Sequence, residues 1–152
     1  MTTAISSTHD ALITLIETAL PLYTRLPEFF GVEENNELYL TKGYALAYGA
    51  GSNSERLISR QASWVQEYGI FLINQIMTTD HDVTGRANAA KAIAEDAHSL
   101  FIALEENPTL SSTGVRTVAL STGGVELLEG DREKYALVEL SVEVEFLQNL
   151  NC

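Results

Sequence analysis

The stretch of sequence that decides the fold is Tyr135–Leu147, which reads YALVELSVEVEFL. Apolar residues occupy every second position, and the alternating set is Ala136, Val138, Leu140, Val142, Val144 and Phe146. Alternation with a period of two is typical of a β-strand with one buried face, and six such positions leave little room for a helix. The sequence therefore predicts a long final strand.

The opposite face of this strand carries Glu139, Glu143 and Glu145. Carboxylates spaced in this way repel one another unless a basic row lies opposite them. One interpretation is a solvated face. The other is an acidic wall: if several copies formed a ring with this strand facing inward, the lumen would be negative and a polyanion could pass without adhering.

The rest of the chain supplies the partners of this strand. Helical spacing of apolar residues predicts an N-terminal helix and a long second helix, and extended runs predict strands between and after them. A Gly-Gly pair favours a hairpin turn, and the Gly-rich segment Gly49–Ser54 favours a turn or loop. The expected elements are helix Ser7–Leu20, strands Leu38–Gly51 and Gln61–Met77, helix Thr84–Glu106, and a hairpin of Gly114–Ser121 and Val125–Leu128 around Gly123-Gly124.

This order predicts an α+β fold, with a largely antiparallel or mixed β-sheet flanked by an N-terminal helix and one long crossing helix. A length of 152 residues fits a single domain, 1–152. Apolar residues make up 45% of the chain, which excludes disorder as a description of the whole. Residues 28–40 match no pattern.

The formal net charge is −12. Such a charge argues against an ordinary nucleic-acid-binding module and against binding to anionic membranes. No signal peptide or transmembrane segment is expected, and Cys152, the single cysteine, excludes an intramolecular disulfide.

Two of the predicted strands are too long for a compact domain of this size. Runs 64–77 and 135–147 would extend about 46 and 43 Å, against a domain diameter of about 38 Å. Either they bend, at Gly69 and Ser141, or they reach past their own domain and bring sheet edges of neighbouring subunits together. Oligomerisation by sheet contact is the hypothesis that follows.

No motif indicates catalysis. The run Asp80-His81-Asp82 has metal-binding atoms but no second ligand cluster, so an acidic helix-capping turn is favoured. His98 follows Glu95 by three residues, as in a surface pair. Gly49 and Gly51 lack the remaining residues of a phosphate loop. We therefore expect no enzyme activity, no cofactor and no metal.

Arg56 and Arg60 follow the Gly-rich segment and carry two of the nine basic charges. They either flank a short helical turn beside Glu55 or bind carboxylates of a neighbouring subunit, for which the arginine fork is suited.

The order of elements and the acidic final strand, ending Val142-Glu143-Val144-Glu145-Phe146, resemble the tail terminator proteins of long-tailed, sheathless bacteriophages, also called tail completion or head-tail joining proteins. The resemblance covers nearly the whole chain and rests on architecture, size and acidity, because the family has no short diagnostic motif.

The resemblance implies a virion protein at the head-proximal end of the tail, assembled in the host cytoplasm into a ring, usually a hexamer. The ring would dock on the tail tube protein, stop tube polymerisation, and offer its other face to the head-tail connector protein. DNA would pass through the lumen without specific binding during ejection. Transferred to this chain, Glu139, Glu143 and Glu145 become candidates for the lumen, and Arg56, Arg60, Gly49 and Gly51 for subunit or ring interfaces.

Two other classes stay open. One is a soluble α+β ligand-binding or catalytic domain whose Trp64, Tyr68 and Phe71 line a pocket. The other is an acidic regulator that mimics the charge of DNA and occupies a basic nucleic-acid-binding protein.

Overall fold

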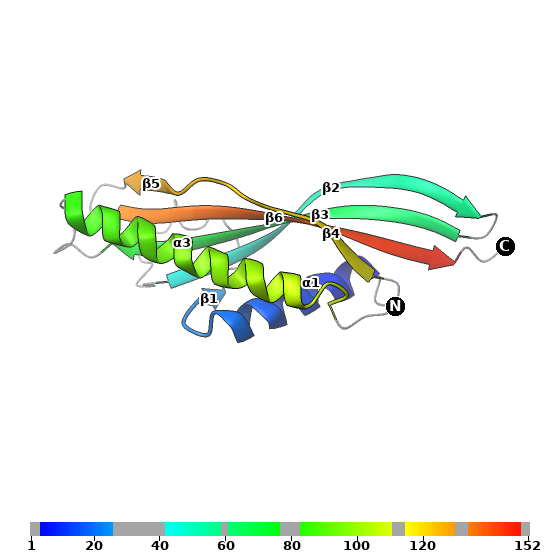
Figure 1. The fold of residues 1–152 in the computed structure, drawn as a ribbon, viewed down its shortest axis with the longest axis horizontal. Coiled ribbons are helices and arrows are strands. Elements are labelled where there is room, and N and C mark those ends of the chain that lie inside the picture. The colour runs from blue at the N-terminus through cyan, green and yellow to red at the C-terminus, as the bar shows by residue number, and fades with distance from the viewer. Residues whose placement is uncertain are drawn as a thin grey trace.

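The structure is a computed structural model that describes residues 4–25, 42–58, 61–76, 83–110, 115–129 and 134–149. For residues 4, 53–58, 61–62, 128–129 and 147–149 it describes the backbone only. The described chain forms two helices and a mixed sheet of six strands, so the predicted α+β class is confirmed (Figure 1). The elements are α1 (Ala4–Ala19), β1 (Thr24–Arg25), β2 (Lys42–Ile58), β3 (Gln61–Ile76), α3 (Val83–Glu106), β4 (Val115–Thr122), β5 (Glu126–Glu129) and β6 (Lys134–Asn149).

The final strand lies inside the sheet, whose order is β1-β2-β3-β6-β4, with β5 also paired to β6. Strands β3 and β6 pair antiparallel without interruption from Gln61↔Asn149 to Ile76↔Lys134. Gly69 pairs in register with Ser141, so neither of these residues breaks the β3–β6 ladder. At about 3.3 Å per residue, each of these strands extends about 50 Å. At the end near the C-terminus, β3 and β6 reach past both helices, whereas at the opposite end α3 extends beyond them (Figure 1).

The core lies between one face of the sheet and the two helices. The alternating residues of β6 are buried as predicted, each with 3% or less of its surface exposed. They pack with Leu12 and Ile16 of α1 and with Leu100 and Leu104 of α3. Both helices therefore cover the same face of the sheet, and the even positions of β6 point toward them.

The prediction of a loop at Gly49–Ser54 is wrong. Strand β2 continues through this segment to Ile58, and its pairing with β3 shifts register between Tyr48 and Gly51 and again between Asn53 and Glu55. The neighbouring strand supplies hydrogen-bond partners all along β2, so the glycine-rich segment is accommodated as bulges within the strand.

The predicted hairpin at Gly123-Gly124 is also wrong. Strands β4 and β5 do not pair with each other: Thr122 pairs with Leu140 and Glu126 with Leu137, so both strands lie along the same edge of β6. The Gly123 amide donates a hydrogen bond to the Glu139 carbonyl, 2.8 Å. The glycine pair is an interruption within one edge of the sheet, because β6 offers a continuous edge to both segments.

Candidate functional site: an acidic face of the central sheet

The three glutamates of β6 lie on the sheet face away from the helices, because the residues between them are buried against α1 and α3. Glu139 is exposed, and Glu143 and Glu145 are half-buried. The prediction that the three share one face is confirmed.

A fourth carboxylate joins them from the neighbouring strand. Glu67 of β3 pairs directly with Glu143 of β6, and Cβ atoms of directly opposite residues lie about 5 Å apart. The Ser141 hydroxyl donates a hydrogen bond to Oε1 of Glu67, 2.8 Å. Glu67 is not among the residues predicted from the sequence, because only the β3–β6 register reveals this pairing. We call Glu67, Glu139, Glu143 and Glu145 the acidic face.

One arginine borders the acidic face. Arg116 of β4 pairs with Glu145 across the sheet, and its Nη2 lies 2.8 Å from Oε1 of that carboxylate. The Arg116 side chain is 67% exposed, whereas that of Glu145 is 18% exposed. The pair lies on β4, the strand that ends the described sheet on this side.

The same sheet face changes character along its length. Toward the other end of β3 and β6 it carries Ala45, Ile73 and Leu137, which are buried. Between the two parts, the Phe71 ring lies 3.3 Å from where a Cβ of Gly69 would stand. The acidic face thus occupies the half of the sheet nearer the end of the β2–β3 hairpin.

The two candidate interface glycines are explained by packing within the chain. A Cβ on Gly51 would stand 2.3 Å from Cζ2 of Trp64, and one on Gly49 would stand 3.0 Å from the Cβ of Glu67. The Gln66 amide donates a hydrogen bond to the Gly49 carbonyl, 2.8 Å. These contacts account for glycine at both positions, and an interface role for them stays a prediction.

The structure describes the backbone of only one of the two candidate arginines, Arg56. Arg56 is part of β2, so the alternative of a short helical turn is wrong for it. Arg60 lies outside the described residues. The hairpin end reaches beyond both helices (Figure 1).

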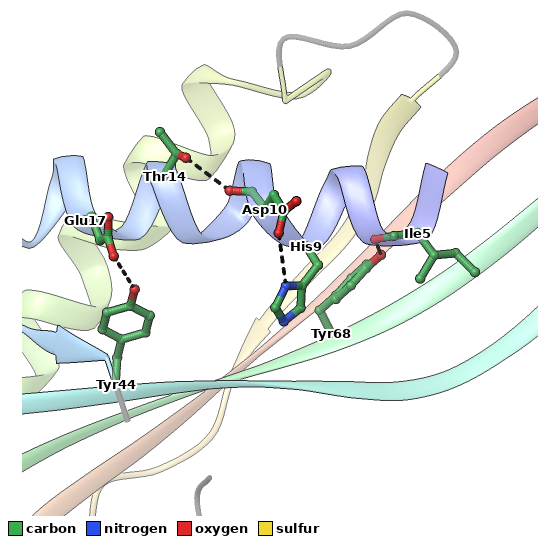
Figure 2. A network of polar contacts seen from close by, with 7 residues as sticks. All are labelled: Ile5, His9, Asp10, Thr14, Glu17, Tyr44 and Tyr68. Atoms are coloured by element: carbon green, nitrogen blue, oxygen red, sulfur yellow. Dashed lines mark hydrogen bonds and ion pairs between the residues drawn. The ribbon is translucent and has the colours of Figure 1, made fainter. Parts of the chain in front are cut away.

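Helix α1 is fixed on the opposite face by aromatic side chains of the sheet (Figure 2). The Tyr44 hydroxyl donates to Oε1 of Glu17, 3.0 Å, and the Tyr68 hydroxyl donates to the Ile5 carbonyl, 2.9 Å. Burial, with Glu17 as a second cause, raises the pKa of Tyr44 to about 12. Burial likewise raises the pKa of Tyr68. These contacts hold α1 on the helix-facing side of the sheet, and neither of the two described helices lies over the acidic face.

The histidines have structural surroundings where they are described. The His9 ring stacks on Tyr48 with centroids 4.9 Å apart, and the His98 ring stacks on Phe101 at 6.5 Å. The run Asp80-His81-Asp82 lies outside the described residues. Within the described ranges, no three His, Cys, Asp or Glu side chains come together as metal ligands would, and no helix is long and apolar enough to cross a membrane.

The aromatic pocket of the ligand-binding alternative is not formed. Tyr68 is fully buried on the helix side of β3, whereas Phe71 lies an odd number of residues away and points to the acidic face. Trp64 lies on the helix side, where its Nε1 donates to Oε1 of Gln66, 3.2 Å. The three rings therefore cannot line one pocket.

Comparison with known proteins adds little to these observations. No family model and no curated protein matches the chain. A solved structure, the virion of a native gene transfer agent particle, is similar over 88% of this chain and 84% of that chain, with 18% sequence identity and a TM-score of 0.31. Since structural similarity at this level is slight, the function has to be argued from this chain's own residues.

Proposed function

We propose that this protein is a structural virion protein of a phage-like particle, which assembles into a ring with the acidic face lining its lumen. In the tail terminator family that the sequence resembles, such a ring is a hexamer that caps the tail tube, ends its polymerisation and binds the head connector. The proposal assigns no catalysis and no cofactor to the chain.

The observation that carries the proposal is the direct pairing of Glu67 with Glu143 on a sheet face that neither of the two described helices covers. Like charges directly opposite each other destabilise a sheet. An arrangement that lowers the stability of the fold is typical of a functional surface. A negative wall repels DNA phosphates, so DNA can move along it without adhering.

The edges of the sheet support closure into a ring. Residues 115–122 of β4 pair with residues 140–146 of β6. The same β6 residues pair with residues 64–70 of β3, which pair in turn with residues 46–53 of β2, so the two outer strands lie at the same height along the sheet. Within the described part of the chain, neither of these two edges pairs with a further strand. Two different edges at one level allow a heterologous contact between copies, and repetition of such a contact closes into a ring when the rotation permits.

The proposal is tested by the assembly state of the purified protein. Sedimentation velocity at micromolar concentration and negative-stain images should show a ring, and particles made without this protein should carry overlong or headless tails. Monomers together with normal particles would refute it. Binding to a basic partner as a monomer would instead support the DNA-mimic alternative.

The lumen is tested by reversing charge. Glu143→Lys together with Glu67→Lys should leave rings and tails intact but slow DNA ejection, because phosphates would bind the wall. Glu95→Lys on the exposed side of α3 is the matched control and should leave ejection unchanged. Equal ejection rates in both variants would count against an acidic lumen.

A further inference from the structure

Only part of each outer edge of the sheet is open to a further strand. On one side, β1 pairs with β2 as far as Tyr44, so the open stretch of β2 begins at Ala45. On the other side, the Thr117 amide donates a hydrogen bond to the Pro108 carbonyl, 2.7 Å, so the open stretch of β4 is residues 118–122. Among the residues that the structure describes, no strand pairs with the outer side of these two open stretches.

The two open stretches run in opposite directions. Strand β2 is antiparallel to β3, β3 is antiparallel to β6, and β6 is antiparallel to β4, so β4 is antiparallel to β2. A second copy in the same orientation therefore brings its β2 alongside β4 as an antiparallel partner. Antiparallel pairing is slightly more stable per residue than parallel pairing, and it satisfies the unpaired backbone groups of an edge.

The open stretches also lie at the same height along the sheet. Tyr48 of β2 is paired with Tyr68, which is paired with Val142 of β6. Val142 is paired in turn with Leu120 of β4. This row of residues lies on the side that the helices cover, because Tyr68 and Val142 are fully buried in the core. A copy placed edge to edge without a shift thus sets its Tyr48 beside Leu120 on that side.

Both open stretches expose a large apolar side chain. Tyr48 is 55% exposed and Val118 is 42% exposed. The Tyr48 ring is held on one face by the His9 ring, with centroids 4.9 Å apart and planes 16° from parallel. Exposed apolar residues on an open edge favour association with another strand, and a ring that is already fixed loses little freedom on binding.

A pocket adjoins the open stretch of β4 on the helix-covered side of the sheet. Its volume is about 190 Å³. A cavity of about 150 Å³ lined by apolar side chains holds a benzene ring, so this pocket has room for the phenol of a tyrosine. The pocket is lined by Leu104, Glu105 and Pro108 at the end of α3 and by residues 117–120 of β4.

One polar atom at this pocket lacks a partner. The Thr117 Oγ1 atom is buried and has no hydrogen-bond partner among the residues that the structure describes. A buried hydroxyl without a partner lowers the stability of the fold. An occupant with an aromatic ring and a hydroxyl group fills the apolar part of the pocket and binds this atom. Tyrosine is the side chain that combines the two.

The charges along the two edges are complementary as well. Arg25 of β1 pairs with Tyr44, whose row continues to Val138 of β6. Glu126 of β5 pairs with Leu137, the neighbouring residue of β6. Arg25 and Glu126 are both exposed. The placement that aligns the two open stretches therefore also brings opposite charges to within one row of each other, which favours this partner and this register.

We propose that the open stretch of β2 in one copy pairs antiparallel with the open stretch of β4 in a second copy, with Tyr48 seated in the pocket beside Leu120. The Tyr48 hydroxyl binds Thr117 Oγ1, and its ring lies between His9 of its own copy and the apolar wall of the pocket. The inference rests on the proposed function, for which it names the contact that joins neighbouring copies.

Disulfide formation tests the pairing directly. In a Cys152→Ser background, differently tagged full-length Tyr48→Cys and Leu120→Cys variants are co-expressed and then exposed to mild oxidation. Cross-linked dimers should contain one chain of each kind. Ser121→Cys is the matched control, because Ser121 is exposed on the same stretch but pairs with Ser141 on the other face of the sheet, so it should not cross-link to Tyr48→Cys. A cross-link at Ser121 alone, or none, in protein that sediments as an oligomer would overturn the pairing.

A double-mutant cycle tests the contact between the two hydroxyl groups. Tyr48→Phe and Thr117→Val should each weaken self-association about fivefold, the effect of losing one hydrogen bond. The double variant should be no weaker than either single variant. Tyr48→Phe keeps the ring that stacks on His9, and circular dichroism confirms that each variant is folded. Self-association unchanged by Thr117→Val would refute the hydroxyl contact.

A charge placed on the open edge tests the strand contact without altering the pocket hydroxyls. Val118→Lys should weaken self-association about tenfold or more, because an apolar side chain that the contact buries is replaced by a charged one. Ile102→Lys is the matched control, since Ile102 is 43% exposed but lies on α3, and it should leave self-association unchanged. Equal effects of the two substitutions would count against pairing at this edge.

The outcomes separate this inference from the proposed function. Rings that form without the Tyr48–Leu120 cross-link and are insensitive to Val118→Lys refute the pairing and leave the ring standing. The cross-link together with coupling in the cycle, but without closed rings, supports the pairing and refutes the ring. Monomers without a cross-link refute both.

Discussion

Replacing Glu143 with glutamine should stabilise the isolated protein, although it removes a charged residue from a central strand. Glu143 faces Glu67 directly. For carboxylates about 6 Å apart, Coulomb's law gives a repulsion of about 0.7 kcal/mol at the dielectric constant of water and about 2.8 kcal/mol at an effective value of about 20. Because Glu143 is half-buried, we expect a gain of about 1 kcal/mol in the free energy of unfolding.

Urea denaturation followed by circular dichroism measures this gain, at low and at high ionic strength. Added salt should raise the stability of the wild type more than that of Glu143→Gln, because salt screens the repulsion that the variant has lost. Glu95→Gln on α3 is the control and should change stability by less than about 0.5 kcal/mol. A loss of stability in Glu143→Gln, or a gain independent of salt, would refute the reasoning.

Three further predictions concern other contacts. Gly51→Ala should destabilise the fold by about 1 to 3 kcal/mol and shift the fluorescence of Trp64, since the new Cβ would stand 2.3 Å from its ring, whereas Gly124→Ala, with nothing within 4 Å, should have little effect. The pKa of Tyr44 is raised from 10.0 to about 12, so between these pH values the unfolded chain loses this proton and the folded chain keeps it, and the free energy of unfolding falls as the pH rises. In urea denaturation at a series of pH values, Tyr44→Phe should remove up to about 1.4 kcal/mol of this fall per pH unit. Arg116→Ala removes a surface ion pair and should lower stability by less than about 1 kcal/mol in thermal unfolding, an effect that high salt removes.

The parts of the fold that depend on one segment alone could be predicted from the sequence. The alternation in β6 fixes both its conformation and its buried face, because a one-residue slip would expose every apolar side chain. The apolar stripe of α3 similarly indicated a helix over Thr84–Glu106, and the structure has Val83–Glu106. In both cases the spacing of apolar residues within one continuous segment determines which face is buried.

The turn predictions failed where a neighbouring strand decides the conformation. Glycines at 49, 51, 123 and 124 all favour turns by their own properties. In the structure, β3 pairs with β2 on both sides of its two glycines, and the Glu139 carbonyl of β6 accepts a hydrogen bond from Gly123. A local signal for a turn cannot reveal that an unbroken strand lies beside it.

The acidic face shows a second limit of prediction from sequence. Sequence alternation placed three glutamates on one face of β6, but a solvated face and a functional wall have the same pattern. The register adds what the pattern lacks: it sets Glu67 opposite Glu143, where solvation alone would favour an opposite charge or a neutral residue. It also sets Arg116 beside Glu145 at the end of the sheet and not in the middle. The proposed lumen accounts for a surface that concentrates like charges at its centre and places a basic residue at its border, whereas a merely solvated face does not call for that distribution.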